Sequence, residues 1–259
     1  MKKVALITGA ASGIGKEFSK IHAKKGGDIV AVDMNAEGLK TLKSELEKAY
    51  GIEVYTIEKN LTQLSAAHEI HHEVLVHNIQ VDYLINNAGF GGVGAFHERD
   101  WAIDLAMIQV NVIALTALTR AFLPDFIARD SGSILNVSST VSLVPGPYQA
   151  VYFATKAYVT SFNRSLYGEL SETGVSSTAL LPGATKTAFG DHSGMNKTAI
   201  YKKPASAAEV ALEGYKAMEQ GEVEVIAGLG WDQRMELKFI PFLSSESLIK
   251  RMKKQSVEH

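Results

Sequence analysis

The chain has 259 residues, of which 46% are apolar and 21% are charged, and its formal net charge is −2. These proportions are ordinary for a globular protein, and the near-neutral charge excludes bulk electrostatic capture of nucleic acid, which needs a basic face. Cysteine is absent, which excludes disulfides, thiolate zinc sites, iron–sulfur clusters and a cysteine nucleophile. This usage is compatible with the cytosol, and we expect a cytoplasmic protein.

Short apolar runs alternate with longer amphipathic stretches along the chain. We expect strands at Val4–Thr8, Asp28–Asp33, Val54–Ile57, Tyr83–Asn86, Ser133–Ser138, Val175–Leu181 and Val223–Ala227. We expect helices at Gly13–Lys25, Ala36–Tyr50, Ser65–Asn78, Trp101–Arg129 (with a break near Pro124), Tyr152–Thr173 and Ala207–Gln220. Strands that are apolar on both faces and alternate with helices predict an α/β fold, a doubly wound parallel sheet covered on both sides. No linker interrupts the pattern, so we predict one domain, 1–259, with its crevice at the carboxyl ends of the strands.

Three segments could be taken for membrane or targeting signals. The apolar run after Lys3 is too short for a signal peptide and is interpreted as a buried strand. The run Ala102–Leu118 is interrupted by Asp104, Gln109 and Asn111, so we expect no membrane span. The basic tail, about 244–259, is predicted to be a helix that packs on its own body or on a partner subunit. Peripheral contact with a membrane surface is the alternative.

The first strand runs into a glycine-rich turn, Thr8-Gly9-Ala10-Ala11-Ser12-Gly13-Ile14-Gly15. Glycines at a strand-to-helix turn let backbone amides approach a pyrophosphate, and the helix N-terminus adds positive potential. The spacing is GxxxGxG, and alone it is weak evidence because it is also compatible with a plain tight turn.

Asp33 closes the second strand, 18 residues after Gly15. A carboxylate there can bond both ribose hydroxyls of an adenosine and repels a 2′-phosphate. Ser12 precedes Gly13 and Met34 follows Asp33, where a basic residue would favour NADP, and Lys16 lies less favourably inside the helix. The sequence therefore favours NAD. The alternative role for Asp33 is an N-cap of the following helix.

Further motifs complete a pattern that resembles the short-chain dehydrogenase/reductase family. They are Asn86-Asn87-Ala88-Gly89, Ser138-Ser139, Tyr152-Phe153-Ala154-Thr155-Lys156 and Pro182-Gly183-Ala184-Thr185-Lys186-Thr187. The resemblance runs from residue 4 to about 190. It implies a Rossmann-type sheet of about seven strands, a nicotinamide cofactor, hydride transfer at a carbon–oxygen centre, and a homodimer or homotetramer. One departure is Asn60, where the family often has aspartate near the adenine.

The resemblance assigns four catalytic residues: Asn111, Ser139, Tyr152 and Lys156. Tyr152 and Lys156 are four residues apart and share a helical face. A neighbouring ammonium favours the phenolate, which lowers the tyrosine pKa from about 10 and suits it to be the general acid/base. Ser139, thirteen residues before Tyr152, would hold the substrate oxygen, while Ser138 caps the strand end or bonds locally. Asn111 would hold a water in the proton path, or is a buried polar group satisfied by backbone.

The cofactor-binding residues implied by the turn and the resemblance lie at the ends of five predicted strands and on the helix predicted at Tyr152–Thr173. They are Thr8, Gly9, Ser12, Gly13, Ile14, Gly15, Asp33, Met34, Asn60, Leu61, Asn87, Ala88, Gly89, Tyr152, Lys156, Pro182, Gly183, Thr185 and Thr187. No metal is expected. His68-Glu69-Ile70-His71-His72 matches the HExxH motif of zinc proteases, but it lies on a predicted sheet-covering helix with no third-ligand motif after it. We interpret it as a solvated face.

The substrate is the least determined feature. In the family a mobile substrate loop follows the last motif, here about 188–204, with Phe189, His192, Met195 and Tyr201. Together with Val141, Leu143, Pro145 and Tyr148 it predicts an apolar pocket for a ketone or secondary alcohol, of acyl-chain or steroid-like type. The leading function is an NAD-dependent alcohol/ketone oxidoreductase. The alternatives are an NADPH-dependent carbonyl or 3-oxoacyl reductase and a non-catalytic dinucleotide-sensing or scaffold protein.

Overall fold

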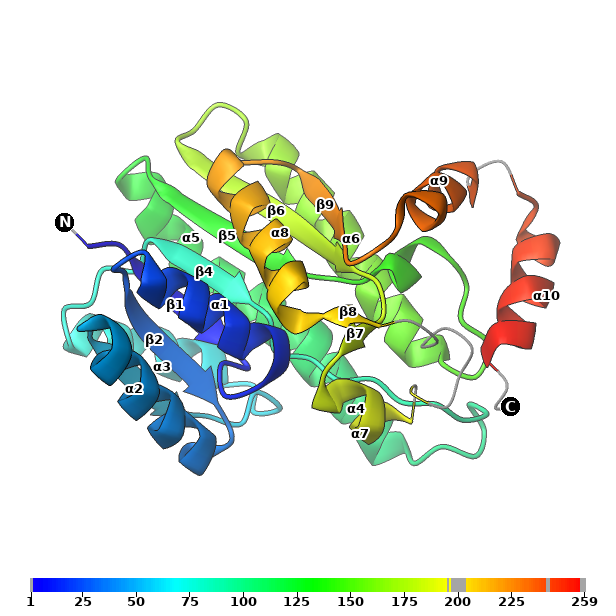
Figure 1. Ribbon diagram of the computed structural model, residues 1–259, viewed down its shortest axis with the longest axis horizontal. Coiled ribbons are helices and arrows are strands. Elements are labelled where there is room, and N and C mark those ends of the chain that lie inside the picture. The colour runs from blue at the N-terminus through cyan, green and yellow to red at the C-terminus, as the bar shows by residue number, and fades with distance from the viewer. Residues whose placement is uncertain (1, 195, 197–203, 241–242, 257–259) are drawn as a thin grey trace.

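The computed structural model describes residues 2–194, 196, 204–240 and 243–256. Its centre is a seven-stranded sheet in the order β3-β2-β1-β4-β5-β6-β9, in which every neighbouring pair is parallel (Figure 1). The strands are β1 (Val4–Thr8), β2 (Asp28–Asp33), β3 (Val54–Glu58), β4 (Tyr83–Asn86), β5 (Gly132–Val137), β6 (Val175–Pro182) and β9 (Glu224–Ala227). The predicted doubly wound sheet of about seven strands is confirmed.

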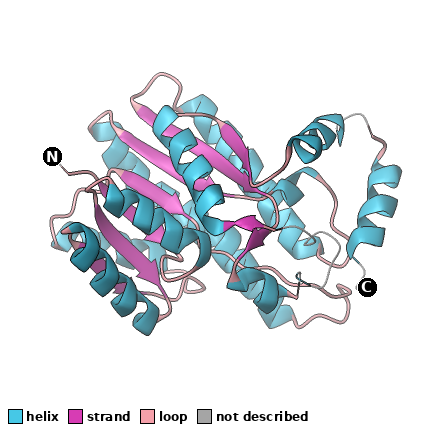
Figure 2. Ribbon diagram, viewed as in Figure 1, coloured by secondary structure: helices cyan, strands magenta, loops and turns pink. Residues whose placement is uncertain are grey.

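The described residues form ten α-helices, six of which cover the two faces of the sheet. The ten are α1 (Gly13–Lys24), α2 (Ala36–Tyr50), α3 (Ala66–Val76), α4 (Trp101–Ile108), α5 (Leu115–Ala128), α6 (Ala150–Glu169), α7 (Ala188–Ser193), α8 (Ala207–Gln220), α9 (Trp231–Phe239) and α10 (Ser245–Ser256). Figure 2 shows α1, α2 and α8 in front of the strands. Their apolar side chains form one core cluster, and those of α3, α5 and α6 form a second cluster on the opposite face.

The apolar character of the strands follows from this two-sided burial. In β1, Ala5 and Ile7 belong to the first cluster, whereas Leu6, between them, belongs to the second. Successive side chains of a strand point to opposite faces, so a strand covered on both sides needs an apolar residue at every position. The order of strands reverses between β1 and β4, and this reversal opens the crevice that holds the site.

The long helix predicted at Trp101–Arg129 is irregular at a different place from the one expected. Pro124 lies inside α5 and the helix continues through it, so the predicted break there is wrong; a single missing backbone donor does not end the helix. The irregularity is the π-helical segment η1 (Gln109–Ala114) between α4 and α5. Such segments occur often at functional sites, and this one contains Asn111.

The run Trp101–Ala128 is also the one helical stretch in the described residues that is long and apolar enough to span a membrane, and 39% of its most apolar window is buried. Its polar residues Asp104 and Asn111 are 1% exposed. Leu118, Phe122 and Phe126 pack in the second core cluster with the sheet. These contacts are those of a helix that covers a sheet.

Three small elements were not predicted. They are α7, α9 and a two-stranded pair of β7 (Thr185–Lys186) with β8 (Ala205–Ser206). The basic tail is helical, as predicted, and Met252 of α10 is buried in a third apolar cluster with Tyr152. In the proposed substrate loop, Met195 and Tyr201, like the side chain of His192, lie outside the described residues.

Candidate active site

A cleft of about 190 Å³ lies at the carboxyl ends of β1, β4, β5 and β6. Its walls come from the glycine turn after β1, the segment after β4, the start of η2 (Thr140–Leu143), α6 and the segment after β6. These are the segments that carry the sequence motifs. Parallel strands present their carboxyl ends at one edge of the sheet, so the motifs meet although they are far apart in sequence.

The glycine turn has the conformation that its residues permit. Gly9 and Gly13 adopt positive φ angles of 66° and 52°. A Cβ atom on Gly15 would stand 2.0 Å from the Gly9 carbonyl oxygen, so only glycine allows α1 to begin this close to β1. The Ser12 side chain makes no capping hydrogen bond to α1, which leaves the helix N-terminus to an external acceptor. The turn therefore fits a phosphate group.

Hydrogen bonds join the turn to the end of β4. The Asn87 side chain donates to the carbonyl oxygens of Thr8 and Gly9 at 2.9 and 3.3 Å. The Thr8 hydroxyl accepts from the backbone amides of Asn87 and Ala88, both at 3.0 Å. Thr8 and Asn87 thus fix the width of the crevice between β1 and β4.

Asp33 at the end of β2 accepts hydrogen bonds from the backbone amides of Ala11 and Asn35, each at 3.0 Å. The helix N-cap role considered for Asp33 is wrong, because Asn35 caps α2 by accepting from the Gly38 amide. Lys16 pairs with Glu45 at 2.8 Å. Asp33 therefore presents a carboxylate beside the glycine turn while Lys16 is held by another acid.

Tyr152 and Lys156 lie in the first two turns of α6, both lining the cleft and only 5% and 4% exposed. The Lys156 Nζ donates to the Val137 carbonyl at 2.8 Å. Burial lowers the pKa of Lys156 to about 8, because a charged group is poorly solvated there. The Tyr152 ring packs against Phe189 with centroids 5.6 Å apart. The pair therefore sits at an apolar, shielded end of the cleft.

The two serines after β5 have different surroundings. Ser138 donates to the Lys156 carbonyl at 2.9 Å and bonds the Thr160 hydroxyl at 2.7 Å. These bonds join Ser138 to α6, whereas we expected bonds to residues next to it in the chain. Ser139 caps η2 by accepting from the Val141 amide at 3.3 Å, and donates to the Pro182 carbonyl at 3.4 Å. Both line the cleft, and only Ser139 holds weak, exchangeable bonds that a substrate oxygen could replace.

Asn111 lies directly behind the cleft, 1% exposed. Its amide accepts from the Phe90 backbone N–H at 3.1 Å and donates to the Phe90 carbonyl at 2.9 Å and to the Thr155 hydroxyl at 3.1 Å. A Cβ on Gly89 would stand 3.0 Å from Asn111 Oδ1 and 3.4 Å from Lys156 Nζ. Asn111 therefore connects the π-helical segment with α6 and with the segment after β4. Its hydrogen bonds go in part to the backbone, as the alternative interpretation of this residue predicted.

The segment after β6 closes the other side of the cleft. Thr187 lies beside the glycine turn, since a Cβ on Gly13 would be 3.2 Å from its methyl group. The Thr187 hydroxyl accepts from the Phe189 amide at 3.3 Å. The Pro182 carbonyl accepts from Ser139 and Thr140. This segment thus bridges the phosphate end and the tyrosine end.

The cleft brings together most of the predicted site residues. Those that line it are Gly9, Ser12, Gly13, Ile14, Asn87, Ala88, Gly89, Ser139, Tyr152, Lys156, Pro182, Gly183, Thr185 and Thr187. Those outside its lining are Thr8, Gly15, Asp33, Met34, Asn60, Leu61 and Asn111. Met34 is 70% exposed, and the Asn60 side chain accepts from Thr62 in a local turn. Sequence reasoning missed Val137 and Thr140 in the wall, which lie in none of the motifs. Ala184 lies inside the last motif and Ala188 begins the predicted substrate loop, but neither was given a role.

The histidine-rich segment falls on α3, as predicted. His71 bonds Asp125 of α5 at 2.8 Å, and the rings of His68 and His72 are stacked with centroids 6.4 Å apart. Among the described residues no three His, Asp or Glu side chains gather in a way that could hold a metal ion.

Comparison with known proteins agrees with the geometry of the cleft. The family model described as short chain dehydrogenase matches residues 3–197. The chain belongs to the short-chain dehydrogenase/reductase family. This confirms the resemblance drawn from the motifs, and residues 198–259 lie outside the match.

The chain covers a different share of the length of each relative. The chain is 36% identical over 190 residues to a short chain dehydrogenase of Pseudocercospora fijiensis, covering 73% of this chain and 61% of that protein. It is 32% identical over 229 residues to the 3-oxoacyl-[acyl-carrier-protein] reductase FabG of Thermotoga maritima, covering 87% of each. Among solved structures, a short-chain dehydrogenase from Sphingobium yanoikuyae in complex with NADPH has a TM-score of 0.83 and 28% identity, covering 96% of this chain and 95% of that one.

Proposed function

We propose that this protein is an NAD-dependent oxidoreductase that transfers a hydride between nicotinamide and an apolar secondary alcohol or ketone. The observation that supports this most strongly is the pair Tyr152 and Lys156, buried side by side on α6 and facing the same cleft as the glycine turn. A sensor or scaffold would need the dinucleotide site but not a buried phenol–ammonium pair. When bound, NAD supplies the hydride acceptor.

The residues of the chain would handle the proton. Lys156, with its pKa near 8, is mainly charged at pH 7, and its charge favours the phenolate form of Tyr152. Tyr152 would then take the hydroxyl proton of the alcohol during oxidation and return it to the carbonyl oxygen during reduction. Ser139 would hold the same oxygen. Asn111 holds Phe90 and Thr155 in place around this pair, and its water-holding role stays a prediction.

Tyr152→Phe tests the proposal. We expect turnover to fall by at least about 100-fold, the range that general acid–base catalysis contributes, because the ring remains and only the proton carrier is removed. NAD affinity should stay within about twofold, measured by calorimetry, while a panel of alcohols and ketones is followed by NADH absorbance. An active Tyr152→Phe variant would refute the assignment. Wild-type protein that binds NAD and turns over nothing would favour the sensor.

The preference for NAD rests on Asp33. Its carboxylate stands beside the glycine turn and would repel a 2′-phosphate, and Lys16 is already paired with Glu45. The alternative is an NADPH-dependent 3-oxoacyl reductase, since one relative carries that reductase name and one similar structure is a complex with NADPH.

Asp33→Ser is the matching experiment. Wild-type protein should bind NAD at least about tenfold more tightly than NADP, and the variant should lose most of this difference because the repulsion is gone. Glu37→Gln, which also removes one charge but lies inside α2, should keep the wild-type preference. Tighter binding of NADPH by the wild type would contradict the role given to Asp33.

We also propose that the protein is a homodimer through the outer face of α4, α5 and α6. Trp101, Ile113 and Tyr158 are 60%, 39% and 40% exposed there. Thr116 of α5 and Tyr158 of α6 are joined by a hydrogen bond of 3.0 Å, so the helices present one continuous surface. Large exposed apolar side chains in a group are typical of an interface.

A further inference from the structure

A second cavity, of about 320 Å³, opens beside the catalytic cleft, between η2 and the helices α9 and α10. It shares Thr140, Val141 and Ala184 with the cleft. Thr140 directly follows Ser139, so the wall that the two cavities share lies next to the place proposed for the substrate oxygen. We call the second cavity the α9–α10 compartment.

The inner faces of the two helices supply an apolar lining. Leu237 and Ile240 come from the end of α9, and Leu248 and Met252 from α10. Residues three or four apart share a helical face, so each helix turns two apolar side chains toward the compartment. Met252 is 8% exposed and packs in one cluster with Val141 and Tyr152. The compartment is thus continuous with the apolar surroundings of the tyrosine.

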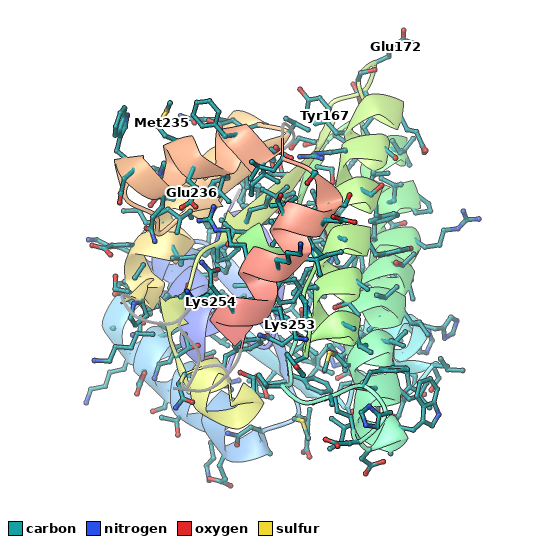
Figure 3. The ribbon with its side chains drawn as sticks, turned by 90° about the vertical axis from the view of Figure 1, so that its right-hand side faces the viewer. Tyr167, Glu172, Met235, Glu236, Lys253 and Lys254 are labelled. Atoms are coloured by element: carbon teal, nitrogen blue, oxygen red, sulfur yellow. The ribbon has the colours of Figure 1, made fainter. Side chains whose placement is uncertain are left out.

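The charged residues of the lining neutralise each other. Glu236 of α9 forms an ion pair with Arg251 of α10, and both side chains are 47% exposed. Figure 3 shows α10 lying across this side of the molecule, between α9 and α6 in that view, with Glu236 on α9. The pair joins the two helices at the rim. Among the described lining residues it leaves the compartment without net charge, so an uncharged chain is favoured over an ionic group.

We propose that the α9–α10 compartment binds a flexible alkyl or acyl chain attached to the carbonyl carbon of the substrate. This rests on the proposed function, because it places the carbonyl group at Tyr152. The volume is about twice that of a 150 Å³ cavity that holds benzene, which is room for roughly ten chain carbons. The lining belongs mainly to residues 229–255, outside the family match, so the chain preference is a property of this protein's own C-terminal segment.

Straight-chain 2-alkanones test the chain preference. In the wild type, kcat/KM should rise with chain length from 2-butanone to 2-decanone, by up to about fourfold for each buried methylene. Leu248→Trp fills the compartment and should lower the 2-decanone/2-butanone ratio of kcat/KM at least tenfold, and Leu237→Trp on the other helix should do the same. Ile249→Trp is the matched control, because Ile249 adjoins Leu248 and is 44% exposed; its ratio should equal that of the wild type.

Direct binding separates this inference from the proposed function. If no alkanone is reduced, the proposed function fails, and calorimetry of 2-decanone with the NAD-saturated protein decides the inference. Binding to the wild type that is lost in Leu248→Trp and kept in Ile249→Trp supports the compartment. A wild type that shows no chain-length dependence and no 2-decanone binding overturns it, as does an unchanged ratio in both Leu248→Trp and Leu237→Trp.

Discussion

Lys156 shows how one residue carries opposing demands of stability and chemistry. In the proposed mechanism its ammonium favours the phenolate of Tyr152, yet it is buried, and burial lowers its pKa from 10.5 to about 8. The unfolded chain therefore binds a proton more tightly than the folded chain between pH 8 and 10.5. Over that window the free energy of unfolding rises with pH, and below pH 8 the folded protein bears the full cost of the buried charge.

Lys156→Met should remove this cost. At about 1.4 kcal/mol per pH unit, the lowered pKa corresponds to a cost of about 3 kcal/mol for burying the charge, which the variant no longer has. The variant also loses the hydrogen bond to Val137, which stabilises the wild type by about 1 kcal/mol. We expect the variant without cofactor to be about 2 kcal/mol more stable at pH 7, and inactive. Urea unfolding of the variant and the wild type at pH 7 and pH 9.5 measures the gain in stability and its dependence on pH. A variant that keeps the wild-type rise in stability between these pH values would show that Lys156 is not its source.

Asn111 and Tyr152 show what sequence can and cannot reveal about single residues. The Tyr152–Lys156 spacing is local, so the helix alone brings the two side chains to one face. Asn111 is connected through Phe90 and Thr155, 21 and 44 residues away, and no local pattern encodes those contacts. Its importance was predicted from the resemblance and bonding to the backbone was foreseen as an alternative, whereas its partners Phe90 and Thr155 were not predicted.

At the scale of elements, local periodicity predicted the strands and long helices but missed the segments that shape the site. In the π-helical segment η1, Asn111 bonds the backbone of Phe90 in a distant segment of the chain. Helix α9 mixes apolar with charged residues, and its relation to the site is visible only together with α10, which it meets in an ion pair and around one cavity. Elements whose stability comes from contacts far along the chain leave little signal in their own sequence.

The loop between β4 and α4 depends on a buried ion pair. Arg99 donates to Asp104 at 2.8 Å and to the Val93 carbonyl at 2.9 Å, and the two charged side chains are 14% and 2% exposed. A Cβ on Gly91, in the same loop, would touch Tyr152 and Phe189 at 3.2 and 3.0 Å. Arg99 therefore positions a loop that contacts the proposed general acid.

Replacing Arg99 should separate the stability of the ion pair from its effect on the loop. Arg99→Met leaves Asp104 buried without its partner and should cost about 3 kcal/mol of unfolding free energy. Adding Asp104→Leu should recover most of this loss, because the uncompensated charge is gone. Turnover should stay reduced in both, since Val93 has lost its anchor. Urea unfolding measures the stability of both variants, and steady-state kinetics measures their turnover. Full recovery of turnover in the double variant would contradict the positioning role of Arg99.

At the scale of the whole molecule, the helices on one face of the sheet have an inner side that covers the sheet and an outer side that is exposed. The inner sides of α5 and α6 cover the sheet and hold the site, through Asn111 just before α5 and Tyr152 and Lys156 on α6, while their outer sides carry exposed apolar residues. If these outer sides pair about a two-fold axis, each copy buries the same patch of the other. Dimerisation would then support, from their outer sides, the helices that carry the proposed catalytic residues.

Ile113→Arg tests this assembly. The change puts a charge on the outer face of η1, where a partner would have to desolvate it, so the variant should become monomeric. Light scattering should give twice the 28.0 kDa chain mass for the wild type and the single mass for the variant. Leu64→Arg is the control, because Leu64 is 72% exposed just before α3 and outside the proposed interface, and it should stay dimeric. A monomeric wild type, or an Ile113→Arg variant with wild-type mass, would show that copies do not pair through this face, and the exposed side chains would then need another partner.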